Sequence, residues 1–127
     1  MGWNMTRKVL ITGSAGHLGR ALRAAFEAQG DVVTGVDLPG TGAEIEVDLD
    51  KYERWEFLES FDVLIANAKC ATWKEHHFIA EMTKSCIVNI GSIYGVLGND
   101  PKIYEGTEVE STPAWYAASK GVLLALT

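Results

Sequence analysis

The stretch KVLITGSAGHLGRALRAAFEAQG, residues 8–30, contains three kinds of segment in succession. It begins with KVLIT, residues 8–12, a short apolar run of the kind that forms a buried parallel strand. A turn with three glycines follows, and GRALRAAFEAQ then has helical spacing up to Gly30, a residue type that commonly ends helices. This order predicts a strand, a tight turn and a helix.

The remainder of the chain repeats the alternation of strand-like and helix-like segments. Further strands are expected at residues 31–37, 43–48, 62–68 and 86–92, helices at 51–60, 72–85 and from Ala114 onward, and a loop at 95–113. Because parallel strands are joined by right-handed crossovers, this pattern predicts helices on both faces of a sheet. We therefore expect one doubly wound α/β domain of Rossmann type over residues 1–127, with about five parallel strands in the order 3-2-1-4-5.

Composition narrows the choice of partners and compartment. The net charge is −6 and no basic run occurs, which argues against nucleic acid or an anionic membrane as a partner. Cys70 and Cys86 lack Cys-x-x-Cys spacing and indicate free thiols in a reducing compartment rather than a disulfide or a metal site. No apolar run approaches the ~20 residues that span a bilayer, and the first residues lack the apolar core of a signal peptide. These features predict a cytoplasmic protein without a metal site.

The glycine-rich turn predicts a phosphate site. Gly13, Gly16 and Gly19 lie between the first strand and its helix, where glycine permits a tight turn, a close approach of the backbone to a pyrophosphate, and close packing of helix on sheet. The amides at the start of the helix then point at the phosphates, with the positive end of the helix dipole behind them. The alternative is a glycine-rich turn without a ligand.

Asp37 strengthens the prediction of a dinucleotide site. It ends the second strand, where a carboxylate accepts hydrogen bonds from the adenosine ribose hydroxyls. The same carboxylate repels the additional phosphate of NADP, so the sequence predicts NAD as the cofactor. The alternative is a solvated aspartate at the end of a strand.

Tyr116 and Lys120 form the segment Tyr-Ala-Ala-Ser-Lys at the start of the last helix. Residues four apart lie on one helical face, within reach of a common ligand. A neighbouring ammonium favours the ionised form of a phenol, which suits a tyrosine that exchanges a proton with a substrate. Taken alone, the pair is equally consistent with a tyrosine and a lysine on the surface of an amphipathic helix.

The order of the polar residues along the chain is more specific than any of them alone. After the glycine turn and Asp37 come Asp48, Asn67 and Ser92, one after each of the next three strands, and then the Tyr116–Lys120 segment. Carboxyl ends of parallel strands form the ligand-binding edge of such sheets. This succession resembles the short-chain dehydrogenase/reductase family from about Lys8 to Thr127.

The resemblance implies a role for each matched residue. Tyr116 would be the general acid or base on the substrate oxygen, Ser92 would hydrogen-bond that oxygen, and Lys120 would hold the nicotinamide ribose. The residues around the pyrophosphate would be Gly13, Ser14, Gly16, His17, Leu18 and Gly19. Asp48 and Leu49 match the adenine contact, and Asn67 and Ala68 match the start of the family's Asn-Ala-Gly segment. Hydride would pass between NAD(H) and a small carbonyl, alcohol or sugar-type substrate.

Three departures from the family pattern keep a second hypothesis open. Lys69 replaces the glycine after Asn67-Ala68, and no asparagine lies between Ala68 and Val88 to serve as the family's catalytic asparagine. The sequence also ends at Thr127, so we expect a chain truncated after the Tyr-x-x-x-Lys helix, without the later strands and the closing loop. The two hypotheses are an NAD-dependent oxidoreductase and an NAD-binding module without turnover.

The last helix predicts an interface. From Trp115 to Leu126 it is apolar on almost every side, which is typical of a helix that is buried on more than one face. We expect a homo-oligomer, a homodimer or larger, that pairs through this helix.

Overall fold

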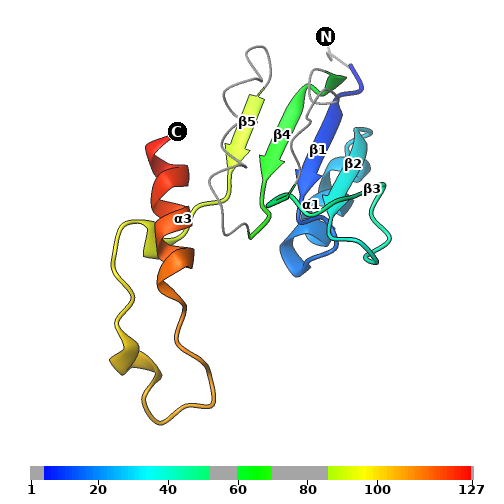
Figure 1. Ribbon diagram of the computed structural model, residues 1–127. Helices are drawn as coiled ribbons and strands as arrows, with labels where there is room; N and C mark the ends of the chain where they lie inside the picture. Colours follow the sequence, from blue (N-terminus) through cyan, green and yellow to red (C-terminus); the bar gives the residue numbers. More distant parts are fainter. Residues whose placement is uncertain (1–4, 52–59, 70–85, 127) are drawn as a thin grey trace.

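The computed structural model describes residues 5–51, 60–69 and 86–126. Its strands form one parallel sheet in the order β3-β2-β1-β4-β5 (Figure 1), which confirms the predicted topology. The strands are β1 (Lys8–Thr12), β2 (Val32–Asp37), β3 (Ile45–Glu46), β4 (Val63–Ala66) and β5 (Cys86–Asn89). The crossover from the β2–β3 side to the β4–β5 side places the ends of β1 and β4 next to each other, where such sheets bind ligands.

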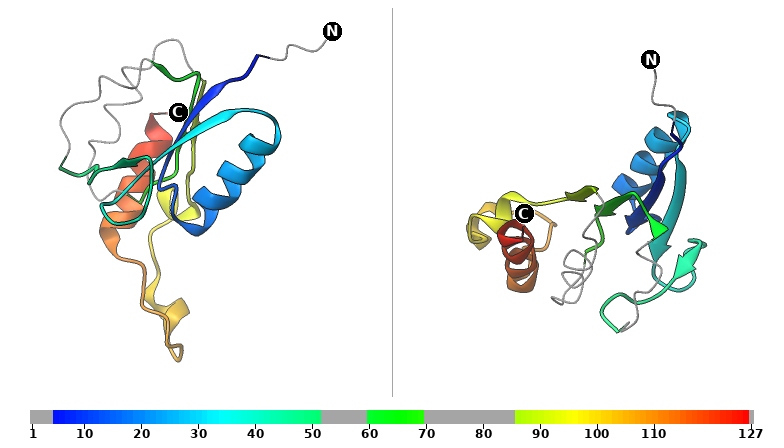
Figure 2. Two further views of the ribbon diagram at one scale, coloured as in Figure 1. Left: turned by 90° about the vertical axis from the view of Figure 1, so that its right-hand side faces the viewer. Right: turned by 90° about the horizontal axis from the view of Figure 1, so that it is seen from above.

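Two α-helices lie on opposite sides of the sheet (Figure 2). They are α1 (His17–Ala28) and α3 (Ala114–Ala125), and the loop between β5 and α3 contains two short 3-10 helices, η2 (Ile93–Gly95) and η3 (Pro101–Tyr104). Gly30 follows α1 with a φ of +87° and donates its N–H to Glu27 O at 3.0 Å, as expected of a glycine that ends a helix. The helix predicted at 72–85, and nearly all of the one predicted at 51–60, lie outside the described residues.

The core has two layers, one on each face of the sheet. Alternate residues of β1 point to opposite faces, so Val9 and Ile11 pack toward α1, with Leu22 and Phe26, while Leu10 packs on the other face. The second face consists of Leu10, Val36, Leu49 and Leu64. The three β1 residues Val9, Leu10 and Ile11 are 0% exposed, because β1 is central in the sheet.

The strands are shorter than their apolar patterns. Residues 43–48 were expected as the third strand, but only Ile45 and Glu46 pair with β2. The carboxylate of Glu44 accepts the N–H of Gly35 at 2.8 Å, so a side chain replaces the backbone acceptor there. β5 likewise ends at Asn89 rather than at Ser92, because the Ser92 side chain accepts the N–H of Tyr94 and begins η2.

Candidate functional site

The glycine turn packs tightly against the end of β4. Gly13 has a φ of +68°, and a Cβ at this position would lie 2.9 Å from Ala68 Cα. A Cβ at Gly19, in the first turn of α1, would lie 2.2 Å from Gly13 O. Both positions therefore require glycine, one for conformation and contact and the other for the approach of the helix to the turn.

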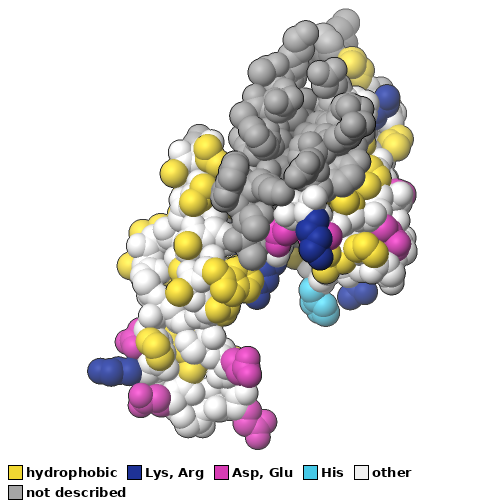
Figure 3. All heavy atoms as spheres, in the orientation of Figure 1, with side chains coloured by type: hydrophobic (Ala, Val, Ile, Leu, Met, Phe, Trp, Pro, Cys, Tyr) yellow, Lys and Arg dark blue, Asp and Glu magenta, His cyan; other side chains and the backbone are white. Residues whose placement is uncertain are grey.

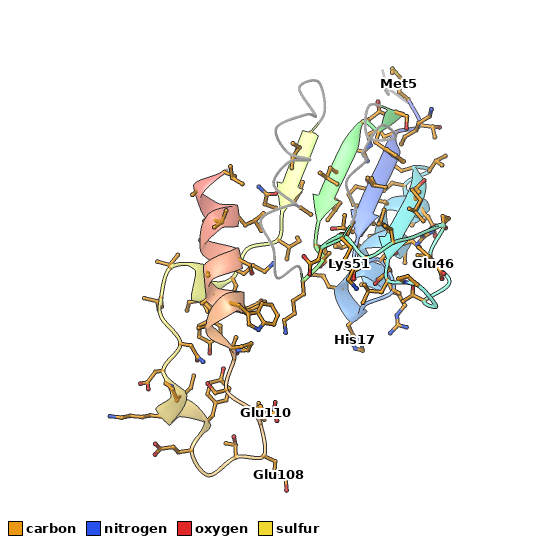
Figure 4. All side chains as sticks on the ribbon, in the orientation of Figure 1. Met5, His17, Glu46, Lys51, Glu108 and Glu110 are labelled. Carbon is orange, nitrogen blue, oxygen red and sulfur yellow. The ribbon has the colours of Figure 1, made fainter. Side chains whose placement is uncertain are left out.

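The start of α1 is open toward solvent. A Cβ at Gly16, the residue that precedes the helix, would lie 3.3 Å from Gly13 O and, apart from the chain neighbours of Gly16, within 4 Å of no other atom of the described residues. His17 and Leu18 are exposed, and Figure 4 shows His17 pointing away from the sheet. The residues at the start of this helix are thus exposed, as access for an anion requires.

Ser14 differs from the other predicted phosphate contacts. Ser14 is 4% exposed. Its side chain occupies the space above Gly35, because a Cβ added at Gly35 would lie 2.3 Å from Ser14 Oγ. Its N–H donates to Val36 O at 3.3 Å. The side chain of Ser14 therefore packs against β2 rather than facing the open end of the turn.

Asn67 and Thr12 fasten the end of β4 to the glycine turn. The Asn67 side-chain amide donates to Thr12 O at 3.0 Å and to Gly13 O at 3.1 Å. In return the Thr12 hydroxyl accepts the N–H groups of Asn67 and Ala68, both at 3.0 Å. Asn67 and Ala68 were predicted site residues, but Thr12 was not. The feature that could have identified Thr12 is its position as a lone polar residue at the end of an apolar strand.

Asp37 lies above the same turn. One oxygen of its carboxylate accepts the N–H of Ala15 at 2.7 Å, and the other accepts the N–H of Leu38 at 2.8 Å. A carboxylate has about four acceptor sites, so it still accepts hydrogen bonds from a ligand. The turn thereby orients the carboxylate at the end of β2.

Two cavities, of about 380 and 460 Å³, adjoin the turn and share Gly13, Asp37, Ala68 and Lys69. The smaller one also contains Asp48 and Leu49, and the larger one also contains Gly16, His17, Leu18 and Asn67. In the space-filling view the molecule is hollowed between the lobe that carries His17, in cyan, and the column that carries α3 (Figure 3). Most of the predicted cofactor residues are thus together at one edge of the sheet.

Asp48 has a charged partner of its own. Its carboxylate pairs with the Lys51 ammonium at 2.9 Å, and this hydrogen bond holds the pKa of Asp48 below its usual range. Leu49, its neighbour, is 6% exposed and belongs to the core. Asp48 and Leu49 therefore place a half-buried acidic group and a buried apolar one side by side at the wall of the smaller cavity.

Ser92, Tyr116 and Lys120 come together at the start of α3. Ser92 and Tyr116 line a third cavity, of about 460 Å³. The Lys120 ammonium lies 5.9 Å from the centroid of the Tyr116 ring and donates to Ile90 O at 2.6 Å. Lys120 is 7% exposed, so the carbonyl of Ile90, just after β5, holds this buried charge in place beside the tyrosine.

A chain of hydroxyl groups shapes the wall of the third cavity. The Tyr94 and Tyr104 hydroxyls lie 2.8 Å apart, and Tyr104 also contacts the Thr112 hydroxyl at 3.1 Å. Hydrogen bonding to Thr112 lowers the pKa of Tyr104, whereas the bond to Tyr104 raises the pKa of Tyr94. Sequence reasoning missed these residues because Tyr104 and Thr112 lie in the loop at 95–113, which has no periodic pattern, and Tyr94 directly precedes it.

Lys69 connects the three cavities, because it lines each of them. Its ammonium lies 5.1 Å from the centroid of the Tyr116 ring and 5.2 Å from that of Trp115. These distances fall within the range of cation–π contacts. The structure thus brings the end of β4 into contact with the start of α3.

The described residues give no indication of a metal site or a membrane span. Among them, no group of three or more histidine, cysteine, aspartate or glutamate side chains is arranged to hold a metal ion. In the same residues no helix has the length and apolar character that crossing a bilayer demands.

One curated protein is similar to part of this chain. The chain is 56% identical over 36 residues to an uncharacterized short-chain type dehydrogenase/reductase from Sinorhizobium fredii. This segment covers 28% of the chain and 7% of that protein. No protein-family model matches the chain.

Solved structures share the fold over almost the whole chain. A short-chain dehydrogenase/reductase superfamily protein from Agrobacterium tumefaciens, with bound NAD, has a TM-score of 0.65 at 20% identity, with 94% of this chain and 43% of that chain covered. A short chain dehydrogenase from Leptospira borgpetersenii, with bound NAD+, has a TM-score of 0.67 at 23% identity, with 97% and 63% covered. The chain therefore spans only part of the length of these proteins. Its fold is that of short-chain dehydrogenases/reductases, and the resemblance to this family is confirmed.

Proposed function

We propose that this chain binds NAD(H) at the carboxyl edge of its sheet and is the cofactor-binding part of an oxidoreductase of the short-chain dehydrogenase/reductase type. The observation that carries the proposal is that the cavities adjoin one another. Those beside the glycine turn and the one that contains Ser92 and Tyr116 have Lys69 as a common wall. A dinucleotide that follows these cavities reaches from Asp48 to Tyr116.

The residues at the turn fit the two ends of the adenosine diphosphate. The open side of Gly16 and the exposed start of α1 suit a diphosphate, because no described side chain lies within 4 Å of a Cβ at Gly16. Asp37 would accept the ribose hydroxyls, and the wall formed by Asp48 and Leu49 would contact the adenine. The carboxylate of Asp37 favours NAD over NADP by charge repulsion.

The second group of residues would act on the substrate. Tyr116 would give a proton to the substrate oxygen or accept one from it, Ser92 would donate a hydrogen bond to that oxygen, and Lys120 would hold the ribose next to it. NAD(H), when bound, supplies the hydride acceptor or donor. Lys120 would exchange its bond to Ile90 O for the ribose or keep both, since an ammonium has three donors.

A calorimetric titration of the purified chain with NAD, NADH and NADP tests the cofactor site. We expect micromolar binding of NAD or NADH, weaker binding of NADP, and a loss of roughly tenfold or more in Asp37→Ala, the size of a hydrogen bond to a charged group. Asp37→Asn keeps the shape of the side chain and separates charge from packing. Glu108→Ala, an exposed carboxylate on the loop before α3 (Figure 4), is the matched control. Failure of every nucleotide to bind would overturn the proposal.

The alternative is an NAD-binding module without turnover. It is favoured by Lys69, a long side chain at the wall of both cavities beside the turn, where the family has glycine. Oxidation of secondary alcohols or reduction of ketones, measured by absorbance of NADH, separates the two functions. Turnover that is abolished in Tyr116→Phe supports the enzyme, whereas nucleotide binding without turnover on any substrate supports the module.

A further inference from the structure

Lys69 is a cation at the junction of the cofactor side and the substrate side of the site. It follows β4 directly, yet its ammonium lies over the rings of Trp115 and Tyr116 in α3. The two rings lie 6.3 Å apart at an interplanar angle of 80°. Their contacts restrict where the ammonium lies, but a cation–π contact leaves its charge available to an anion.

Among the residues that the structure describes, no carboxylate forms an ion pair with Lys69. The ion pairs found within the described residues are Arg7–Asp31, Arg23–Glu27, Arg23–Glu44 and Lys51–Asp48. Lys69 takes part in none of them. Lys69 is exposed, and an ammonium that lines a cavity and has no ion-pair partner among the described residues attracts an anionic group that enters the cavity.

The third cavity has a defined chemistry. Its hydroxyl-bearing walls are Ser92, Tyr94, Ser111, Thr112 and Tyr116. Its charged residues are Lys69 and Glu110, and Glu110 comes from the loop before α3 (Figure 4). A ligand with several hydroxyl groups and one anionic group matches these side chains. Its anionic group must lie at the Lys69 end, because Glu110 would repel it.

We propose that Lys69 determines substrate specificity by binding a carboxylate or phosphate of the substrate beside the carbon that Ser92 and Tyr116 address. The inference rests on the proposed function for the identity of that carbon. The anion site itself does not depend on the proposed function, because it follows from the third cavity and the charge of Lys69. The substrate class is then a hydroxylated carbonyl or alcohol that carries an acidic group.

The experiment compares probes that share a ring and differ in charge. D-glucose, D-glucuronate and glucose 6-phosphate are titrated into the full chain by calorimetry or ligand-observed NMR at low salt, with and without NADH. We expect both anions, or one of them, to bind roughly tenfold or more tightly than glucose, the size of one charge-assisted hydrogen bond. The ratio of glucuronate to glucose 6-phosphate affinity distinguishes a carboxylate site from a phosphate site.

Three variants assign the effect to Lys69. Lys69→Gln is expected to abolish the advantage of the anions over glucose, and Lys69→Arg to retain most of it. Lys8→Gln removes the same charge from an exposed residue at the start of β1, away from the ligand-binding edge of the sheet, and serves as the matched control. Circular dichroism of each variant verifies the fold.

Each result separates this inference from the proposed cofactor site. Equal binding of glucose and both anions, no binding of the anions, or an advantage that survives in Lys69→Gln overturns it. Weaker NADH binding in Lys69→Gln with unchanged anion binding also overturns it, because Lys69 then serves the cofactor diphosphate. A Lys69-dependent anion advantage without any NADH binding supports the anion site and contradicts the proposed cofactor site.

Discussion

At the scale of single residues, the three glycines of the turn have different functions. Gly13 needs its positive φ and lies against Ala68, Gly19 lets α1 approach the turn, and Gly16 leaves space for a ligand. Sequence spacing predicted all three as a group. It could not distinguish them, because the atoms that a Cβ would meet come from the folded turn and from the end of β4.

Gly19→Ala should destabilise the protein. The added methyl group would overlap Gly13 O and the Ser14 backbone, which are rigid parts of the turn. We expect a loss of about 1–3 kcal/mol or more in the free energy of unfolding, as for other overpacked sites. Urea denaturation measures it. Gly98→Ala is the control, because apart from its chain neighbours no described residue has an atom within 4 Å of a Cβ there. Equal stability of the two variants would contradict the steric argument.

At the scale of elements, an ion pair joins the beginnings of β1 and β2. Arg7 Nε donates to Asp31 at 2.9 Å, and the second bond of the pair measures 2.5 Å. The Asp31 side chain is 4% exposed, and its hydrogen bonds from Arg7 hold its pKa below the usual range. Arg7 also lies 5.8 Å from the centroid of the Phe26 ring in α1. One charged pair thus links two strands and a helix.

This pair predicts a pH dependence of stability. Because the pKa of Asp31 is lower in the folded state than in the unfolded state, its contribution is complete above about pH 4 and disappears as the pH falls through the folded value. Asp31→Asn should be less stable than the natural protein at pH 7, and the difference should shrink toward pH 2. Thermal unfolding at several pH values tests this, with Glu108→Gln as the control. A difference that is constant with pH would show that packing, rather than charge, is lost.

Elements also show the limits of the sequence pattern. Period and apolar content located every strand, but the extent of β3 depended on Glu44, whose carboxylate takes the Gly35 N–H. The loop at 95–113 was predicted as irregular, and within it the Tyr104 hydroxyl contacts that of Thr112 as well as that of Tyr94, which directly precedes the loop. Contacts of this kind follow from the path of the loop, which local propensity does not encode.

At the scale of the whole molecule, α3 leaves an apolar side exposed. Lys120 and Leu123 are buried, whereas Trp115, Val122 and Leu126, which share a helical face, are 43%, 42% and 44% exposed. We propose that a second copy of the chain covers this face. Light scattering at micromolar concentration should show a dimer or larger, and Val122→Asp with Leu126→Asp should shift it to the monomer. A natural protein that is monomeric at this concentration would refute the interface.

The strand order, the glycine turn and the positions of Asp37 and Asn67 at strand ends were all available from the sequence. So was the order in which Asp48 and Ser92 follow β3 and β5, although both lie beyond the ends of these strands. Periodicity and the rules of parallel crossovers depend on local pattern, so they transfer directly from sequence to fold. The meeting of Lys69 with Trp115 and Tyr116, and the cavities around it, came only from the tertiary structure. Lys69 is far from Trp115 and Tyr116 in the chain. The packing of α3 beside β5 brings them together, and such packing depends on how side chains from separate elements fill one space.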